Sequence, residues 1–217
     1  MRVYVETNFV LELALVQEEA RSCRAILDLC TAGRAELAVP AYSLAEPFEN
    51  LIRRHRTRKR ISEELDRELH QLSRTEDYAD PLARFSEIAS LLQDSVDDDW
   101  ERLAKVRSEI LECARVIPLT AEILISAATK RQGRDFSPQD SLVYASVLAD
   151  LEAGPPGESL FLNRNTRDFD DPGIVGSLKQ HGCLLLPTFR QGLQVLSRPS
   201  AGGSGETGTT ASVMASA

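Results

Sequence analysis

The stretch VYVETNFV, residues 3–10, places a carboxylate, a hydroxyl and an amide between two apolar runs. Val3–Val5 is a short apolar run of the kind that forms a strand buried on both faces of a parallel sheet. The second run continues with helical spacing to Leu15. Glu6 therefore closes a buried strand, where a carboxylate needs a partner. This pattern predicts a polar site at the carboxyl end of the first strand.

Short apolar runs and helical patterns alternate along most of the remaining chain. The four further predicted strands are Glu36–Val39, Val116–Leu119, Ser159–Leu162 and Leu184–Leu186. The predicted helices are Phe9–Leu15, Glu18–Leu29, one from Ser43 that reaches Leu51 or beyond, Ile61–Leu72, Leu82–Leu92, Trp100–Arg115, Thr120–Arg131 and Ser137–Leu151. Because such alternation is typical of βαβ crossovers, the sequence predicts an α/β fold with a parallel sheet.

Composition excludes several protein classes. The 217 residues are 42% hydrophobic and carry a net charge of −8, as an ordinary globular domain does. No run of 18 apolar residues predicts a membrane span, and the N-terminus lacks the pattern of a secretory signal. The four cysteines form no CxxC pair. We therefore expect free thiols and a cytoplasmic location.

Two segments depart from the alternation. Residues 55–115 show only helical patterns with charged faces, so we expect a helical insertion within a domain spanning residues 1–197. The acidic run Val96–Glu101 is predicted to begin a helix, where the helix dipole stabilises acids. Residues 198–217 are rich in Gly, Ser, Thr and Ala and are predicted to be a disordered tail.

Four acidic residues are predicted to meet at one edge of the sheet, outside the carboxyl ends of the strands. In chain order they are Glu6, Glu46, Asp140 and Asp168. Carboxylates that converge repel one another and would become protonated unless a cation lies among them. Oxygen ligands suit Mg²⁺ or Mn²⁺, and such an ion can activate water for attack on a phosphodiester.

Three polar residues are predicted to support these acids: Asn8, Ser43 and Asn165. Asn8 also fits the N-cap of the first helix. Ser43 is placed to orient carboxylates or water, and Asn165 to shape the loop around Asp168. An ordinary loop acid is the alternative role of Asp168, and Asp170 and Asp171 compete with it for the role in the site. The stretch Asp170–Gly173 is itself predicted to be a turn.

Helix capping is the alternative role of two of the acids. Ser43-Leu-Ala-Glu46 fits a capping box, in which Glu46 would accept a hydrogen bond from the backbone N–H of Ser43. Ser137-Pro-Gln-Asp140 places a serine at the N-cap, a proline at the first helical position and an acid in the first turn. Taken with Glu6, the set favours metal ligation over capping.

The run RRHRTRKR, residues 53–60, concentrates positive charge directly after the Glu46 helix begins. Its six cations are Arg53, Arg54, Arg56, Arg58, Lys59 and Arg60. Removing these six from the net charge of −8 leaves −14 on the rest of the chain. A run of like charge is usually a solvated face, but here it also fits a phosphate track that extends from the acidic site.

Four ordered motifs resemble those of PIN-domain nucleases, the fold of many VapC-type toxin ribonucleases. VYVETNFVLEL is similar to the strand, Asp-Thr-Asn and helix that open the family, with Glu6 in place of the usual first Asp. VPAYSLAEPFENL offers the second acid, Glu46, and SPQDSLVYASVLADL offers the third, Asp140. LFLNRNTRDFDDPGI resembles the closing motif and offers Asp168.

This resemblance implies a three-layer α/β/α fold with a central mostly parallel sheet. It also implies a ribonuclease in which Glu6, Asp140 and Asp168 hold Mg²⁺ or Mn²⁺, Glu46 joins the catalytic set, and Asn8 supports it. The partners implied are an RNA substrate, a cognate antitoxin and a second copy of the chain. A catalytically inactive module that binds RNA or protein is the alternative, motivated by Glu6.

Overall fold

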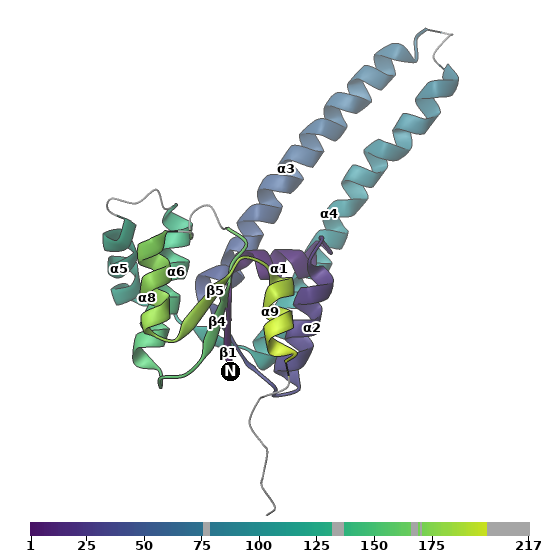
Figure 1. Ribbon diagram of the computed structural model, residues 1–217. Coiled ribbons are helices and arrows are strands. Elements are labelled where there is room, and N and C mark those ends of the chain that lie inside the picture. Colours follow the sequence, from purple (N-terminus) through teal and green to yellow (C-terminus); the bar gives the residue numbers. More distant parts are fainter. Residues whose placement is uncertain (76–78, 132–136, 166–168, 170, 199–217) are drawn as a thin grey trace, which may run out of the picture.

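A five-stranded parallel sheet forms the centre of the computed structural model, which describes residues 1–75, 79–131, 137–165, 169 and 171–198 (Figure 1). The strands are β1 (Arg2–Val5), β2 (Glu36–Pro40), β3 (Arg115–Ile117), β4 (Ser159–Leu162) and β5 (Cys183–Leu186). They lie in the order β3-β2-β1-β4-β5, and each neighbouring pair is parallel. The predicted parallel sheet is therefore confirmed, and its central strand is β1.

Helices cover both faces of the sheet. Val3 and Val5 contribute to a core against one set of helices, whereas Tyr4, pointing to the other face, belongs to a second core. The first set includes α1 (Thr7–Ala14), α2 (Ala20–Thr31) and α9 (Phe189–Leu196). The second set is α5 (Ala121–Arg131), α6 (Pro138–Ala153) and α8 (Pro172–Gln180). The three-layer α/β/α architecture is thus confirmed.

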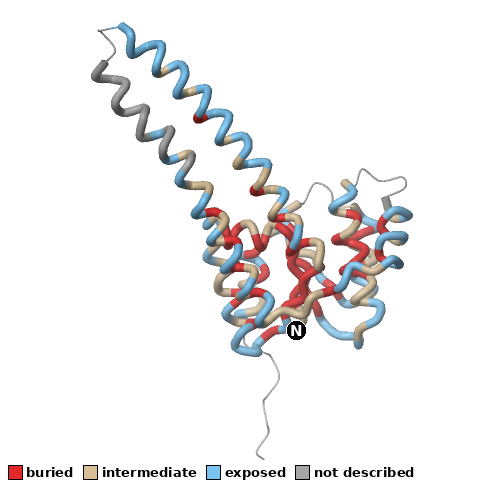
Figure 2. Tube along the Cα trace, turned by 180° about the vertical axis from the view of Figure 1, so that it is seen from behind, coloured by how far each residue is buried: buried red, intermediate tan, exposed pale blue. Residues whose placement is uncertain are grey.

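Two long helices, α3 (Ala41–Leu72) and α4 (Ala79–Cys113), pack side by side and project from the sheet as an antiparallel hairpin. Figure 2 shows that burial is concentrated at its base, whereas most of projecting α3 is exposed. Near the base, Leu103 and Ile110 of α4 are fully buried in the core beside α1 and α2. The hairpin is therefore anchored at the end that lies next to the sheet.

The expectation of several shorter helices in this region is wrong. The predicted helices from Ser43 and over Ile61–Leu72 form one continuous α3, because the Arg and Lys residues between them are strong helix formers. The acidic run Val96–Glu101 does not begin a helix but lies inside α4. Its member Asp99 is 3% exposed, and Arg58 neutralises it with a hydrogen bond of 2.7 Å.

Two helices near the C-terminus, α8 and α9, were not expected from the sequence. The predicted turn at Asp171 is wrong, because the Asp171 carboxylate caps α8 by accepting hydrogen bonds from Gly173 and Ile174 at 2.9 and 3.1 Å. Thr188 caps α9 in the same manner. Residues 199–217, where we expected disorder, lie outside the described residues.

The four cysteines are free, as predicted. Cys23, Cys30 and Cys183 are buried, so they behave as small apolar side chains. Among the described helices, none combines the length and the apolar character that a membrane span requires.

Candidate active site

A polar pocket of about 560 Å³ lies at the carboxyl ends of the central strands. Glu6 directly follows β1 and Asn163 directly follows β4, and both line the pocket. Glu46 of α3 and Asp140 of α6 complete a set of three lining carboxyl groups. Three of the four acids predicted to converge therefore border one cavity, although 134 residues separate the first from the last of them in the chain.

Glu6 is the most deeply buried of these acids, with only 6% of its surface exposed. As the N-cap of α1, its Oε2 accepts a hydrogen bond of 2.8 Å from the backbone N–H of Asn8. Its Oε1 is buried and accepts no hydrogen bond within the part of the chain that the structure describes. Burial raises the pKa of Glu6 to about 7, and the nearby charge of Asp140 adds to the rise.

Asn8 therefore does not cap α1, although it lines the same pocket. The capping role that the sequence offered to Asn8 belongs to Glu6, because the helix begins at Thr7, two residues earlier than the predicted start at Phe9. Asn8 instead holds the Glu6 carboxylate through its backbone N–H, and both its backbone and its side-chain amide oppose the rise that burial causes in the pKa of Glu6.

Glu46 is held by Thr7, whose Oγ1 donates a hydrogen bond of 2.5 Å to Glu46 Oε2. Burial raises the pKa of Glu46, the Thr7 hydrogen bond opposes the rise, and the charge of Asp140 adds to it. The capping box with Ser43 is wrong, because α3 begins at Ala41 with Pro40 as its N-cap. Glu46 thus turns toward the sheet edge rather than back along its own helix.

Ser43 lies inside α3, fully buried, and is not among the residues that line the pocket. Its Oγ has no hydrogen-bond partner within the described residues. The structure thus separates Ser43 from the acids it was predicted to support. Glu46, the acid on the same helix, takes its hydroxyl hydrogen bond from Thr7 instead.

Asp140 combines the two roles that the sequence left open. Ser137 caps α6, accepting a hydrogen bond of 3.0 Å from the backbone N–H of Asp140, and its hydroxyl in turn donates to the Asp140 carboxylate. Asp140 nevertheless lines the pocket, and its charge raises the pKa values of both Glu6 and Glu46. Capping fixes the carboxylate in place beside the other two acids.

The loop after β4 forms a further wall of the acidic pocket. Asn163 is 2% exposed, and its Oδ1 accepts a hydrogen bond of 2.7 Å from the backbone N–H of Asn165, so the two asparagines brace the loop. Both line the pocket. Asp168 lies outside the described residues. Its neighbour Phe169 is buried and packs edge-on against Phe161 of β4.

Sequence reasoning missed an ion pair beside the pocket. Arg164, which lines the pocket, donates a hydrogen bond to Oε1 of Glu12 in α1. Glu12 is 1% exposed, and its Oε2 accepts a hydrogen bond of 2.7 Å from the backbone N–H of Glu19. The sequence did contain a signal for this ion pair, because Glu12 lies three residues after Phe9 and therefore on the apolar face of α1, where a buried acid needs a partner.

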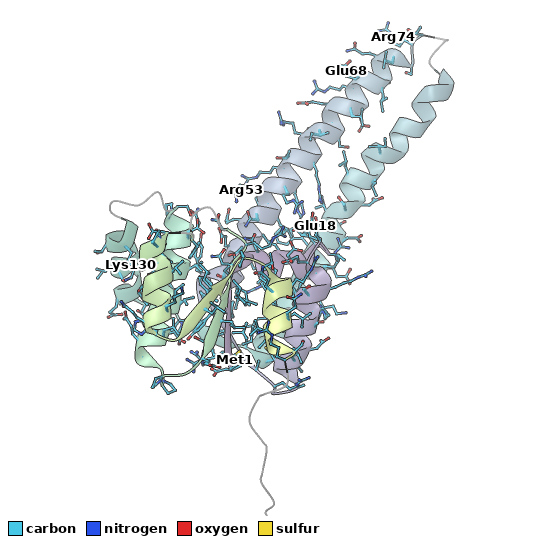
Figure 3. All side chains as sticks on the ribbon, in the orientation of Figure 1. Met1, Glu18, Arg53, Glu68, Arg74 and Lys130 are labelled. Carbon is cyan, nitrogen blue, oxygen red and sulfur yellow. The ribbon has the colours of Figure 1, made fainter. Side chains whose placement is uncertain are left out.

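The six predicted cations do not share one environment. Arg53 lines the acidic pocket, and Figure 3 labels it near the base of the projecting part of α3. Arg54 and Arg56 are exposed. Lys59 and Arg60 are exposed and lie 4.0 and 3.9 Å from Glu63 and Glu64, respectively.

Arg58 is bound within the hairpin instead. Its Nη1 donates hydrogen bonds of 2.7 Å to Asp99 and 2.9 Å to the Ser95 hydroxyl of α4. The guanidinium therefore neutralises a buried carboxylate and has an internal structural role.

The donor set fits a hard divalent cation. Within the described residues, no three His, Cys, Asp or Glu side chains lie close enough together to form a metal centre by themselves. Glu6, Glu46 and Asp140 nevertheless share the pocket, and the charge of Asp140 raises the pKa values of the other two acids. The unpartnered Oε1 of Glu6 supplies a buried oxygen ligand, and carboxylate oxygens are what Mg²⁺ and Mn²⁺ prefer.

A family model described as the PIN domain matches residues 3–169. Searches of curated proteins and of solved structures returned no match. PIN domains are generally nucleases and typically use divalent metal ions, which agrees with a carboxylate pocket at the carboxyl edge of a parallel sheet. The matched segment begins at β1 and reaches Phe169, so it includes every acid predicted for the site, and the chain belongs to the PIN-domain family.

Proposed function

We propose that the protein is a ribonuclease that depends on Mg²⁺ or Mn²⁺ and hydrolyses phosphodiester bonds of RNA. The observation that carries this proposal is the shared pocket of Glu6, Glu46 and Asp140, with one buried oxygen of Glu6 left without a hydrogen bond among the described residues. The charge of Asp140 opposes the ionisation of both Glu6 and Glu46, so the arrangement favours a cation as their common partner.

Glu6, Glu46 and Asp140 are assigned roles from their positions in the pocket, and Asp168 is assigned its role from the resemblance of its motif to that of the family. Glu6, Asp140 and Asp168 would hold the cation, which when bound supplies Lewis acidity and lowers the pKa of water. Glu46, which Thr7 holds at 2.5 Å, would accept the proton of the attacking water. Hydrolysis by this route needs no covalent intermediate.

Two residues outside the acid set orient the substrate in this proposal. Arg164, fixed by the buried Glu12, presents a guanidinium to the pocket from the loop after β4. Arg53 presents another from α3, on the side of Glu46. Guanidinium groups pair well with phosphate oxygens, so these two positions would hold phosphates on either side of the acids.

The test is RNA cleavage with Mn²⁺ and with excess chelator, comparing wild type with Glu6→Gln and Asp140→Asn. Glu152→Gln is the matched control, because Glu152 is an exposed acid of α6 that does not line the pocket. We expect cleavage by wild type and the control, and losses of at least about a hundredfold in both site variants. Equal cleavage by all four proteins contradicts the proposal.

A toxin role within a toxin–antitoxin pair, with a small antitoxin and a homodimer, is a narrower form of this proposal. The support for it is the resemblance of the four motifs to VapC-type proteins. Expression in bacteria tests it: a toxin arrests growth, and Asp140→Asn relieves the arrest. Growth unaffected by the wild-type chain contradicts the toxin role and leaves the nuclease proposal to the cleavage assay.

An inactive RNA- or protein-binding module is the second candidate. Glu6, which stands where the family usually has Asp, favours it, because the longer side chain moves the carboxylate by one methylene. Thermal unfolding with Mn²⁺ separates the two candidates. A metal-binding site raises the melting temperature by mass action, whereas an inactive module without the site shows no shift at millimolar Mn²⁺.

A further inference from the structure

A second hollow, of about 400 Å³, lies on α3 next to the acidic pocket. It is lined by Asn50, Arg53, Arg54, Thr57 and Arg58. Asn50 and Arg53 also line the acidic pocket, so the two hollows share a wall and follow one another along the helix. The surface therefore continues from the acids onto the projecting hairpin, at the point that Figure 3 marks with Arg53.

Helix geometry explains why these residues share a face with Glu46. An α-helix turns once every 3.6 residues, so Asn50, Arg53 and Thr57, at four, seven and eleven residues after Glu46, return to the same side. Seven residues rise about 10 Å along the helix axis. Arg53 therefore lies roughly two helical turns from the proposed general base.

Of the three arginines that line this hollow, one is bound within the protein and two are exposed to a ligand. Arg58 forms its wall toward α4 and is bound by the buried Asp99. Arg53 and Arg54 are exposed, and Asn50 Oδ1 holds the guanidinium of Arg53 at 2.5 Å. Two guanidinium groups and the polar side chains of Asn50 and Thr57 are thus presented along one groove.

Resting on the proposed function, we infer that this groove binds the sugar-phosphate backbone of single-stranded RNA on its way to the acidic pocket. Arginine pairs bidentately with phosphate oxygens, and the groove presents two exposed arginines on a chain whose net charge is −8. The described residues that line the two hollows include no aromatic side chain on which bases could stack. Binding should therefore depend little on base sequence.

The remaining cations of the run provide an internal control. Arg56 and Lys59 are exposed on the same helix, but neither lines either hollow. Replacing Arg56 and Lys59 removes two positive charges from α3, as many as replacing Arg53 and Arg54 removes. A difference between the two double variants therefore reports the groove and not the net charge of α3.

The experiment measures fluorescence anisotropy of labelled oligouridylate and oligoadenylate with excess chelator, so that binding is separated from cleavage. The proteins are wild type, Arg53→Gln with Arg54→Gln, and Arg56→Gln with Lys59→Gln. The groove variant is the double variant at Arg53 and Arg54, and the control variant is the one at Arg56 and Lys59. For two lost phosphate contacts we expect the groove variant to bind RNA roughly tenfold more weakly than wild type at moderate salt. The slope of its log affinity against log salt concentration should be smaller in magnitude by about 1.4. The control variant should lose much less affinity, and both oligonucleotides should give the same ranking.

Equal losses in the two double variants would contradict the groove, since they would show attraction to general charge. Undiminished binding by the groove variant would also overturn the inference, and points to another ligand, such as an acidic protein segment. Both results are separable from failure of the nuclease proposal, which is decided by cleavage with Mn²⁺. Cleavage by wild type together with unchanged RNA affinity of the groove variant rejects the groove alone.

Discussion

Replacing Glu6 by Gln should stabilise the metal-free protein at alkaline pH while abolishing its proposed activity. The pKa of Glu6 is raised from 4.5 to about 7, chiefly by burial. The folded protein thus keeps this proton to higher pH than the unfolded chain, so stability falls as the pH rises between these values. Glutamine is neutral at every pH and can still accept the hydrogen bond from the Asn8 N–H.

The size of the effect follows from the two pKa values. The ionisation cost is less than about 1 kcal/mol at pH 5 and about 3 kcal/mol at pH 8, and it is constant at higher pH. Urea unfolding with excess chelator should therefore give Glu6→Gln a small advantage at pH 5 and a large one at pH 8. The exposed Glu152→Gln should show neither.

Added Mn²⁺ should reverse the order at pH 8, because only the wild type keeps the full ligand set. A Glu6→Gln variant no more stable than wild type at pH 8 in chelator would refute a costly buried charge at Glu6. An equal advantage at pH 5 and pH 8 would refute it as well, since burial of a charge would then not be the cause.

Three further substitutions test contacts around the site by urea or thermal unfolding. Glu12→Gln removes the buried partner of Arg164 and should lower the free energy of unfolding by about 1–3 kcal/mol; an unchanged midpoint would contradict the pairing. Asp99→Asn leaves Arg58 without its buried counterion and should cost about 3 kcal/mol, and a cost near zero would mean that the pair does not anchor the hairpin. Ser137→Ala removes the N-cap of α6 and should cost about 1 kcal/mol, visible as a melting temperature lower by several degrees at most.

The sheet and the approach of the acids could be predicted because local patterns determine them. Val3–Val5 and Ser159–Leu162 are short apolar runs, and the carboxyl ends of parallel strands meet at one edge. Glu6 follows from that rule, whereas Asp140 was predicted from its place at the start of the Ser137 helix and from the resemblance of its motif to that of the family. The cap at Ser137 was also visible, since an N-cap serine followed by proline is a local signal.

Other features depend on contacts between distant residues and have no local signal. Thr7 holds Glu46 across 39 residues, and this contact replaces the capping box that Ser43 suggested. Arg58 pairs with Asp99 across 41 residues, which removes one cation from the predicted track. Tertiary contacts of this kind decide which of two locally acceptable roles a polar side chain takes.

The continuous α3 and the cap at Asp171 show a different limit. The charged residues of the basic run are good helix formers, but they carry no apolar stripe. The run therefore lacks the hydrophobic periodicity from which a continuous helix could be predicted. Asp171-Pro172-Gly173 fits a turn and a helix start equally well. The helix forms because Ile174 and Leu178 of α8 are buried in the core on that face of the sheet.

Counting bound Mn²⁺ tests the central claim most directly, namely that acids from separate elements form one metal site. Titration of Mn²⁺ followed by calorimetry, at pH 8, should compare wild type, Glu6→Gln, Asp140→Asn and the control Glu152→Gln. We expect saturable binding to wild type and the control, and affinities lower by about tenfold or more in each site variant. Identical isotherms for all four proteins would contradict the account.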